Sequence, residues 1–184
     1  MLDGEFRNFA VWLIPSASQR LQLRSTIHAL ARNCGSPPFQ PHVTLVEGFH
    51  DGKLSELAHG IKDFFEGLGS VSFGVTGVNW ADNYFTFLYL SLIDQSAIFE
   101  FAATFFLKAH TPQVGPHLSL AYCDRYEDID RAALARGLTG KLPESLLCTS
   151  VELVIPLGGD WREDAHWLSQ PIAELGPAKN GSQM

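Results

Sequence analysis

The chain has 184 residues and a formal net charge of −7 at pH 7; 46% of its residues are hydrophobic and 18% are charged. This composition is typical of a soluble globular protein with one substantial core or two small lobes, and it excludes a disordered chain. The 13 Lys and Arg residues form no basic stripe, which argues against a polynucleotide partner but not against a small phosphorylated ligand.

In the first half of the chain, apolar periodicity predicts the order strand, helix, strand, helix, strand. Apolar residues 9–14 run into Pro15 and predict a buried strand, and a helical spacing of apolar residues follows a capping Ser16 or Ser18. A strongly amphipathic segment at 51–68 predicts a second helix, and alternating apolar residues at 71–75 predict a strand. The expected strands are 9–14, 42–47 and 71–75, and the expected helices are about 16–35 and 51–68.

The second half repeats this order. An apolar run that begins at Phe85 predicts a strand covered on both faces, Asp94 caps a helix, and Gly137 closes a shorter one. The expected strands are 85–92, 117–123 and 148–155, and the expected helices are 94–108 and 127–136. Because strands and helices follow the same order in both halves, the sequence indicates an internal duplication of roughly 75 residues. The halves lie at about 9–80 and 84–157.

One short pattern occurs in both halves, as PHVTL at 41–45 and PHLSL at 116–120. Side chains alternate between the two faces of a strand, so each histidine shares a face with the hydroxyl residue two positions later. Each copy therefore presents an imidazole and a hydroxyl side by side. These candidate site residues are His42, Thr44, His117 and Ser119.

We therefore expect an α+β fold with two pseudo-twofold-related lobes, each an antiparallel sheet with helices on its outer face. Such lobes would bring the two motif strands together in a cleft, with both histidines around one point. A single bilobal domain would span residues 1–176, followed by a flexible tail at 177–184. The alternative is a plain α+β domain in which the histidines only lie at an interface.

Two imidazoles and two hydroxyls suit the cleavage of a phosphodiester by in-line attack. One group must take a proton from water, another must protonate the leaving oxygen, and donors must hold the remaining phosphate oxygens. Histidine, with an ordinary pKa of about 6.5, can serve in either proton role near pH 7. We therefore expect neither a metal nor another cofactor. The other histidines lack ligand spacing and are expected at the surface: His28, His50, His59, His110 and His166.

Nucleophilic catalysis by Ser119 or Thr44 is a weaker alternative, because the chain shows no triad order and no nucleophile elbow.

The two motifs resemble those of the 2H phosphoesterase superfamily, in which H-x-[ST]-L segments lie on duplicated lobes. Over residues 9–157 the chain is most similar to the small cyclic nucleotide phosphodiesterases of fungi and plants, through Trp12 in VWLIP, the proline before each motif histidine, and Tyr122. The resemblance implies that His42 is the general acid and His117 the general base, although the two labels are interchangeable. It also implies roles for the neighbouring side chains as phosphate ligands (Thr44 and Ser119) and aromatic walls (Trp12 and Tyr122).

Tyr122 lies at an odd offset from His117, so a regular strand would point it to the opposite face. It would reach the cleft only through a bulge or past the end of the strand. For both Tyr122 and Trp12 the alternative is an ordinary core position.

The resemblance further implies the hydrolysis of small cyclic phosphates. These are ADP-ribose 1″,2″-cyclic phosphate, a by-product of tRNA splicing that opens to ADP-ribose 1″-phosphate, and nucleoside 2′,3′-cyclic phosphates, which open to 2′-phosphates. One alternative is a phosphodiesterase or ligase of the same type that acts on RNA ends. Another is a catalytically idle nucleotide-binding module.

The sequence also bears on the location of the protein, the state of its cysteines and its partners. Its first residues are acidic, and no apolar run approaches the ~20 residues of a membrane helix. Cys34, Cys123 and Cys148 lack the paired spacing of a zinc ribbon or a disulfide framework, so we expect reduced, buried thiols rather than the disulfides of plant members. The expected partner is a small cyclic nucleotide, with no polynucleotide and no membrane. We expect a monomer in the cytoplasm, with the nucleus as a second location.

Overall fold

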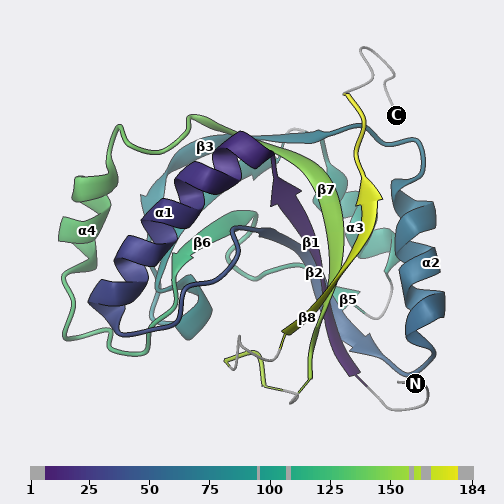
Figure 1. The fold of residues 1–184 in the computed structure, drawn as a ribbon, viewed down its shortest axis with the longest axis horizontal. Helices are drawn as coiled ribbons and strands as arrows, with labels where there is room; N and C mark the ends of the chain where they lie inside the picture. Colours follow the sequence, from purple (N-terminus) through teal and green to yellow (C-terminus); the bar gives the residue numbers. More distant parts are fainter. Residues whose placement is uncertain (1–6, 95, 107–108, 158–159, 163–166, 178–184) are drawn as a thin grey trace.

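The structure is a computed structural model that describes residues 7–94, 96–106, 109–157, 160–162 and 167–177. His166 and most of the expected tail therefore lie outside the described residues. Within them, no helix is both long and apolar enough to cross a membrane. The helices are α1 (Ala17–Cys34), α2 (Leu54–Phe65), α3 (Ile98–Phe105) and α4 (Arg131–Leu138), with a short 3₁₀ turn η1 (Tyr84–Thr86). The strands are β1 (Arg7–Pro15), β2 (Val43–His50), β3 (Val71–Asn79), β4 (Leu88–Asp94), β5 (Ala109–His110), β6 (His117–Ala121), β7 (Ser145–Pro156) and β8 (Trp167–Glu174) (Figure 1).

The helices form where apolar periodicity predicts them. Along α1, the buried residues are Leu23, Ile27, Leu30, Ala31 and Cys34, and the helix ends at Gly35, whose φ of 66° is the left-handed conformation that glycine adopts readily. In α4, Asp130 caps the N-terminus by accepting a hydrogen bond from the Ala133 amide. These helices cover the sheet: α1 lies against β6, and α2 lies beside β8 (Figure 1).

All strands belong to one eight-stranded sheet with the order β1-β2-β6-β4-β3-β7-β8, in which β5 pairs with β2. Because β1 also pairs with β7, the strands from β1 to β7 in this order form a closed circuit. The expected pair of lobes, each with its own sheet, is therefore not what the strand pairing shows. The mixed α and β class and the antiparallel pairing agree with the expectation.

The two halves exchange their last strands. β3 belongs to the first half but pairs with β4 and β7, whereas β7 belongs to the second half and pairs with β1. Periodicity predicts where a strand lies but not which strand it pairs with. The exchange explains why the duplication does not produce two separate sheets.

The two motifs lie on neighbouring strands of this circuit, β2 and β6. β2 and β6 are antiparallel, and Val43 pairs with Leu118; these are the residues that follow the two motif histidines. Since equivalent residues face each other, a pseudo-twofold axis passes between them.

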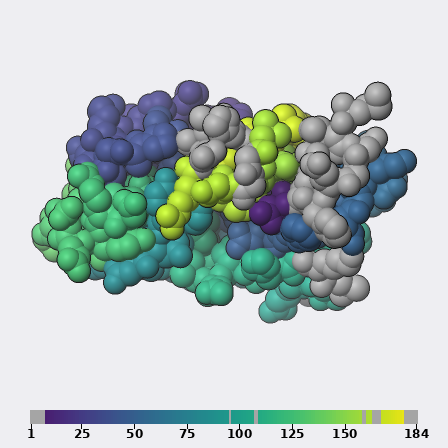
Figure 2. All heavy atoms as spheres, turned by 90° about the horizontal axis from the view of Figure 1, so that it is seen from below, coloured from purple at the N-terminus to yellow at the C-terminus, as the bar shows by residue number. Residues whose placement is uncertain are grey.

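The structure differs from the expected elements in three places. β5 has only two residues, and β8 is an edge strand whose side chains are mostly exposed and which contains Pro171, so neither carries a buried alternating pattern. The expected strand at 85–92 is instead η1 followed by β4. The three cysteines are buried and unpaired, as expected. In Figure 2, the yellow-green residues of the β7–β8 region lie across one face, between purple and blue residues of the first half and green and teal residues of the second.

Candidate active site

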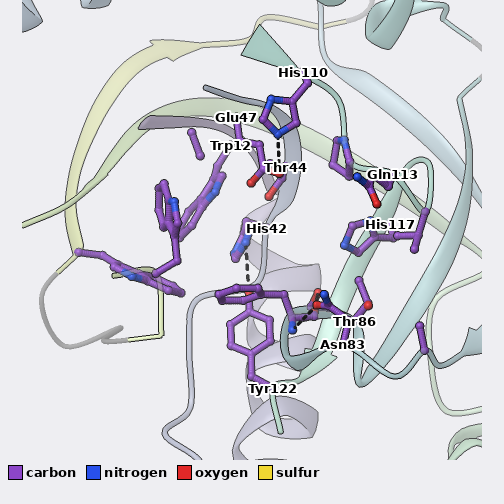
Figure 3. A pocket seen from close by; sticks show the side chains of 18 of the residues that line it. Trp12, His42, Thr44, Glu47, Asn83, Thr86, His110, Gln113, His117 and Tyr122 are labelled. Atoms are coloured by element: carbon purple, nitrogen blue, oxygen red, sulfur yellow. Dashed lines mark hydrogen bonds and ion pairs between the residues drawn. The ribbon is translucent and has the colours of Figure 1, made fainter. Parts of the chain in front are cut away.

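The two motifs line one open cavity of about 430 Å³ (Figure 3). His42, Thr44, His117 and Ser119 all border it, so the structure brings together the four residues that the repeated pattern singles out. The alternation along β2 and β6 has the expected result, because Val43 and Leu118 are fully buried on the other face. The cavity lies at the junction of the two halves, where the pseudo-twofold axis passes.

Each motif histidine is held through the same ring nitrogen. Nδ1 of His42 lies 2.7 Å from the carbonyl oxygen of Gln40, and Nδ1 of His117 lies 2.9 Å from that of Gly115. A carbonyl oxygen only accepts, so each ring carries a proton on Nδ1 and leaves Nε2 available to exchange a proton. In both cases the carbonyl belongs to the residue just before the motif proline.

Burial affects both imidazoles. It lowers the pKa of His42 from its ordinary value of 6.5 to about 3; the hydrogen bond to Gln40 opposes this shift, and the charge of His117 adds to it. Burial also lowers the pKa of His117, while the hydrogen bond to Gly115 and the negative charge of Glu47 raise it. The two rings share a sequence pattern but stand in different electrostatic surroundings.

The two hydroxyls also differ. Ser119 is 5% exposed, and its Oγ donates a hydrogen bond of 2.6 Å to the carbonyl oxygen of Phe85. The Thr44 hydroxyl makes no hydrogen bond within the described part of the chain and lies at the cavity wall. Thr44 can therefore donate to a bound phosphate directly, whereas Ser119 must first release Phe85.

Both expected aromatic walls border the cavity. Trp12 stacks on His42 with ring centroids 3.6 Å apart and an interplanar angle of 7°. The Tyr122 hydroxyl lies 3.5 Å from Nε2 of His42, and the Tyr122 ring stacks on Phe39 at 3.8 Å. Trp12 and Tyr122 are 4% and 5% exposed, so each is packed in the interior as well as lining the cavity.

A β-bulge brings Tyr122 to this face. β4 pairs Leu88 with Ala121 but Tyr89 with Ser119, so Leu120 is the extra residue on β6. An extra residue reverses the alternation beyond it. Ser119 and Tyr122 thus point into the same cavity despite their odd spacing.

A β-bulge in the first half likewise brings Glu47 to the cavity, a residue that the sequence analysis does not single out. β1 pairs Val11 with Val46 but Trp12 with Thr44, so Leu45 is the extra residue on β2 and Glu47 turns toward the cavity. The signal was present: Glu47 is the fifth residue after the first motif histidine, as Tyr122 is after the second.

His110, expected at the surface without a role, is a further lining residue. Its Nε2 lies 3.2 Å from Oε1 of Glu47, with which it also pairs across β2 and β5. The side chains of His110 and Glu47 are 66% and 43% exposed. The ion pair, drawn as a dashed line in Figure 3, therefore borders the cavity and is in contact with water.

The remaining lining adds aromatic and polar surface but no cation. Thr86 is 7% exposed, and its hydroxyl has no hydrogen-bond partner among the described residues. Trp161 and Trp167 form an aromatic side of the cavity, and residues 112–114 lie beside the second motif. None of the described lining residues is Lys or Arg. The described residues also contain no group of three or more His, Cys, Asp or Glu side chains that could hold a metal ion.

Comparisons with known proteins identify the fold. No family model matches the chain, and no curated protein sequence matches it. Solved structures do match. E. coli LigT without ligand has 12% sequence identity and a TM-score of 0.58, and the match covers 95% of this chain and 99% of that chain. The complex of E. coli LigT with ATP has 14% identity and a TM-score of 0.57 over the same shares. A structure described as a phosphoesterase has 13% identity and a TM-score of 0.56, over 95% of this chain and 100% of that chain. The chain therefore has the fold that E. coli LigT and this phosphoesterase share.

Proposed function

We propose that the chain is a metal-independent phosphodiesterase of the 2H phosphoesterase type that hydrolyses small cyclic phosphates. The observation that carries this proposal is the placement of two imidazoles, His42 and His117, on one cavity, each with Nδ1 held by a carbonyl so that Nε2 is the nitrogen that can exchange a proton. In-line hydrolysis of a phosphodiester requires one proton acceptor and one proton donor on opposite sides of the phosphorus. The shared fold with a phosphoesterase supports the same conclusion.

The reaction needs no covalent intermediate with the protein. One neutral imidazole takes a proton from water, the water oxygen forms a bond to phosphorus, and the bond from phosphorus to the ribose oxygen opposite breaks. The second imidazole, in its cationic form, protonates that leaving oxygen. Thr44 donates to a non-bridging oxygen, where negative charge increases in the transition state.

The substrates that we propose are ADP-ribose 1″,2″-cyclic phosphate, opened to ADP-ribose 1″-phosphate, and nucleoside 2′,3′-cyclic phosphates, opened to nucleoside 2′-phosphates. The partly exposed rings of Trp161 and Trp167, which border the cavity, suit stacking on a base. E. coli LigT structures contain ATP, 3′-AMP or NADP+, so the fold accommodates adenine nucleotides. This activity would place the protein in the metabolism of tRNA-splicing by-products.

Two other functions are less well supported. An enzyme acting on RNA ends needs cations along the strand, but the described lining carries Glu47 and Asp82 and no Lys or Arg. An idle nucleotide-binding module has no need for two imidazoles held in equivalent ways.

A direct assay tests the proposal. The full chain is incubated with ADP-ribose 1″,2″-cyclic phosphate and with 2′,3′-cyclic AMP in the presence of EDTA, and ³¹P NMR identifies which ester opens. We expect the cyclic phosphate of at least one of them to open, with 2′-AMP as the product of 2′,3′-cyclic AMP. We also expect EDTA to cause no loss of activity. Binding of 2′-AMP without turnover of either compound would overturn the proposal in favour of the idle module. Faster turnover of a short oligonucleotide than of the cyclic compounds would favour the RNA-end reading.

A further inference from the structure

The pseudosymmetry makes Glu47 the counterpart of Tyr122. Each is the fifth residue after a motif histidine, and each reaches the cavity because a leucine, Leu45 or Leu120, is an extra residue in its strand. The equivalence extends to the neighbouring strands, where Trp12 pairs with Thr44 and Tyr89 pairs with Ser119. The duplicated halves therefore put a carboxylate and a phenol at equivalent places in the cavity.

The pseudosymmetry relates each of these two side chains to the histidine of the other half. Tyr122, from β6, approaches Nε2 of His42 at 3.5 Å. Glu47, from β2, borders the same cavity as His117, and its negative charge raises the pKa of His117, against the larger lowering effect of burial. The crossed arrangement follows from the antiparallel pairing at Val43 and Leu118, which carries the end of each strand past the histidine of the other.

The other groups near the two rings do not change the difference between His117, which has a carboxylate on its side of the cavity, and His42, which has a phenol. His117 also meets the edge of Tyr89, at 5.4 Å and 70°, and His110 shares Glu47 from β5. His42 is enclosed by the ring of Trp12 at 3.6 Å and that of Phe39 at 6.1 Å, and His117 is the ionisable group that repels a charge on it. Thus His117 has a carboxylate nearby, and His42 has aromatic rings and a phenol.

We propose that Glu47 is a positioning residue that makes the two motif histidines unequal: it favours the proton on His117, which becomes the general acid, and leaves His42 as the general base. The assignment rests on the proposed function, and it reverses the labels that the resemblance implies. A carboxylate stabilises an imidazolium, whereas burial against an indole ring and a phenol favours the neutral ring. Burial lowers the pKa of both rings, but the charge of Glu47 raises that of His117, whereas no negative charge among the described residues does so for His42.

In this scheme the protons balance. His42 Nε2 accepts a proton from water as the new bond to phosphorus forms, and His117 Nε2 gives its proton to the ribose oxygen as that bond breaks. The enzyme then holds a cationic His42 and a neutral His117, and solvent restores the initial state. The Glu47–His110 pair, which borders the cavity, is exposed enough for His117 to recover its proton there.

Charge variants test the electrostatic part without relying on turnover. We would titrate the ring signals of His117 by NMR in the full chain and in Glu47→Gln, Glu47→Asp and Glu56→Gln. Glu56 is exposed in the first turn of α2, so its variant makes the same change in net charge outside the cavity. We expect a lower titration midpoint for His117 in Glu47→Gln, a midpoint near that of the wild type in Glu47→Asp, and no change in Glu56→Gln. Equal midpoints in Glu47→Gln and Glu56→Gln would overturn the proposal.

A substrate analogue tests the assignment of roles. In a 2′,3′-cyclic nucleotide with sulfur at the leaving 3′ position, the thiolate departs without a proton, so the general acid becomes dispensable. We expect His117→Ala to recover about tenfold or more of its lost rate on this analogue, and His42→Ala to recover little. Rescue of His42→Ala instead would reverse the assignment. If the wild type hydrolyses no cyclic phosphate at all, the proposed function fails; if it does and the rescue is absent or reversed, only the present inference fails.

Discussion

Val43 and Leu118, each next to a catalytic candidate, face one another across the junction of β2 and β6. Continuing the antiparallel register places His42 beside Ser119 and His117 beside Thr44. An imidazole from one half thus lies next to a hydroxyl from the other, and neither half alone supplies a complete site. Under the proposed function, the phosphate group would contact both copies of the motif.

Removal of either imidazole should abolish most of the activity. We expect His42→Ala and His117→Ala each to lower kcat on 2′,3′-cyclic AMP by about 10²–10⁴, with a smaller effect on KM, because each group acts in the transition state. The double variant should lose less than the product of the two single losses. The measurement is steady-state kinetics at several pH values, with His59→Ala on exposed α2 as the control. Full activity of either motif variant would contradict the proposed function.

The two hydroxyls should respond differently to removal. Thr44→Val should lower activity with little effect on stability, because the Thr44 hydroxyl makes no hydrogen bond in the described chain. Ser119→Ala leaves the Phe85 carbonyl without its donor in a buried place, which costs about 1–3 kcal/mol in the free energy of unfolding. Urea denaturation and kinetics on the same samples would separate the two effects. Equal losses of stability in the two variants would show that the difference in hydrogen bonding has no energetic consequence.

The sequence was sufficient to predict the histidine pair and the strand and helix order of both halves. His42 and His117 were recognisable because the same five-residue pattern occurs twice, and α1 and α2 because their apolar residues fall on one face. These features depend on local periodicity, which a single sequence displays directly.

What could not be predicted depends on pairing between distant strands. The exchange of β3 and β7 between the halves leaves no local signature, and neither does the extra residue at Leu45 or Leu120. Because those bulges reverse the alternation, Glu47 was overlooked and Tyr122 could be placed only conditionally. His110 is exposed, as expected, but its place beside the cavity could not be predicted, because that place depends on its pairing with Glu47 across β2 and β5.

The pH dependence of kcat/KM should be bell-shaped, with its optimum on the acid side of neutrality. This parameter reports the free enzyme, in which the pKa of His42 lies at about 3 and that of His117 lies below 6.5. Activity requires one ring neutral and the other cationic, so it should rise as His42 loses its proton and fall as His117 loses its own. We expect Glu47→Gln to move the alkaline limb to lower pH and leave the acid limb in place. A profile that stays flat from pH 4 to 8 would contradict a mechanism with two histidines.

The stability of the protein should decrease on acidification because of His42. Its pKa is about 3 in the folded chain, against 6.5 for an ordinary histidine. Between these values the unfolded chain binds the extra proton, so the free energy of unfolding decreases as the pH falls, by at most about 1.4 kcal/mol per pH unit. Above pH 6.5 both states are neutral at this site, and the contribution is constant. In His42→Gln this dependence is absent, so the difference in unfolding free energy between the wild type and the variant should shrink below pH 6.5. Urea denaturation from pH 4 to 8 measures it, with His59→Gln as the control; parallel curves for wild type and His42→Gln would show that His42 takes up its proton equally well in the folded chain.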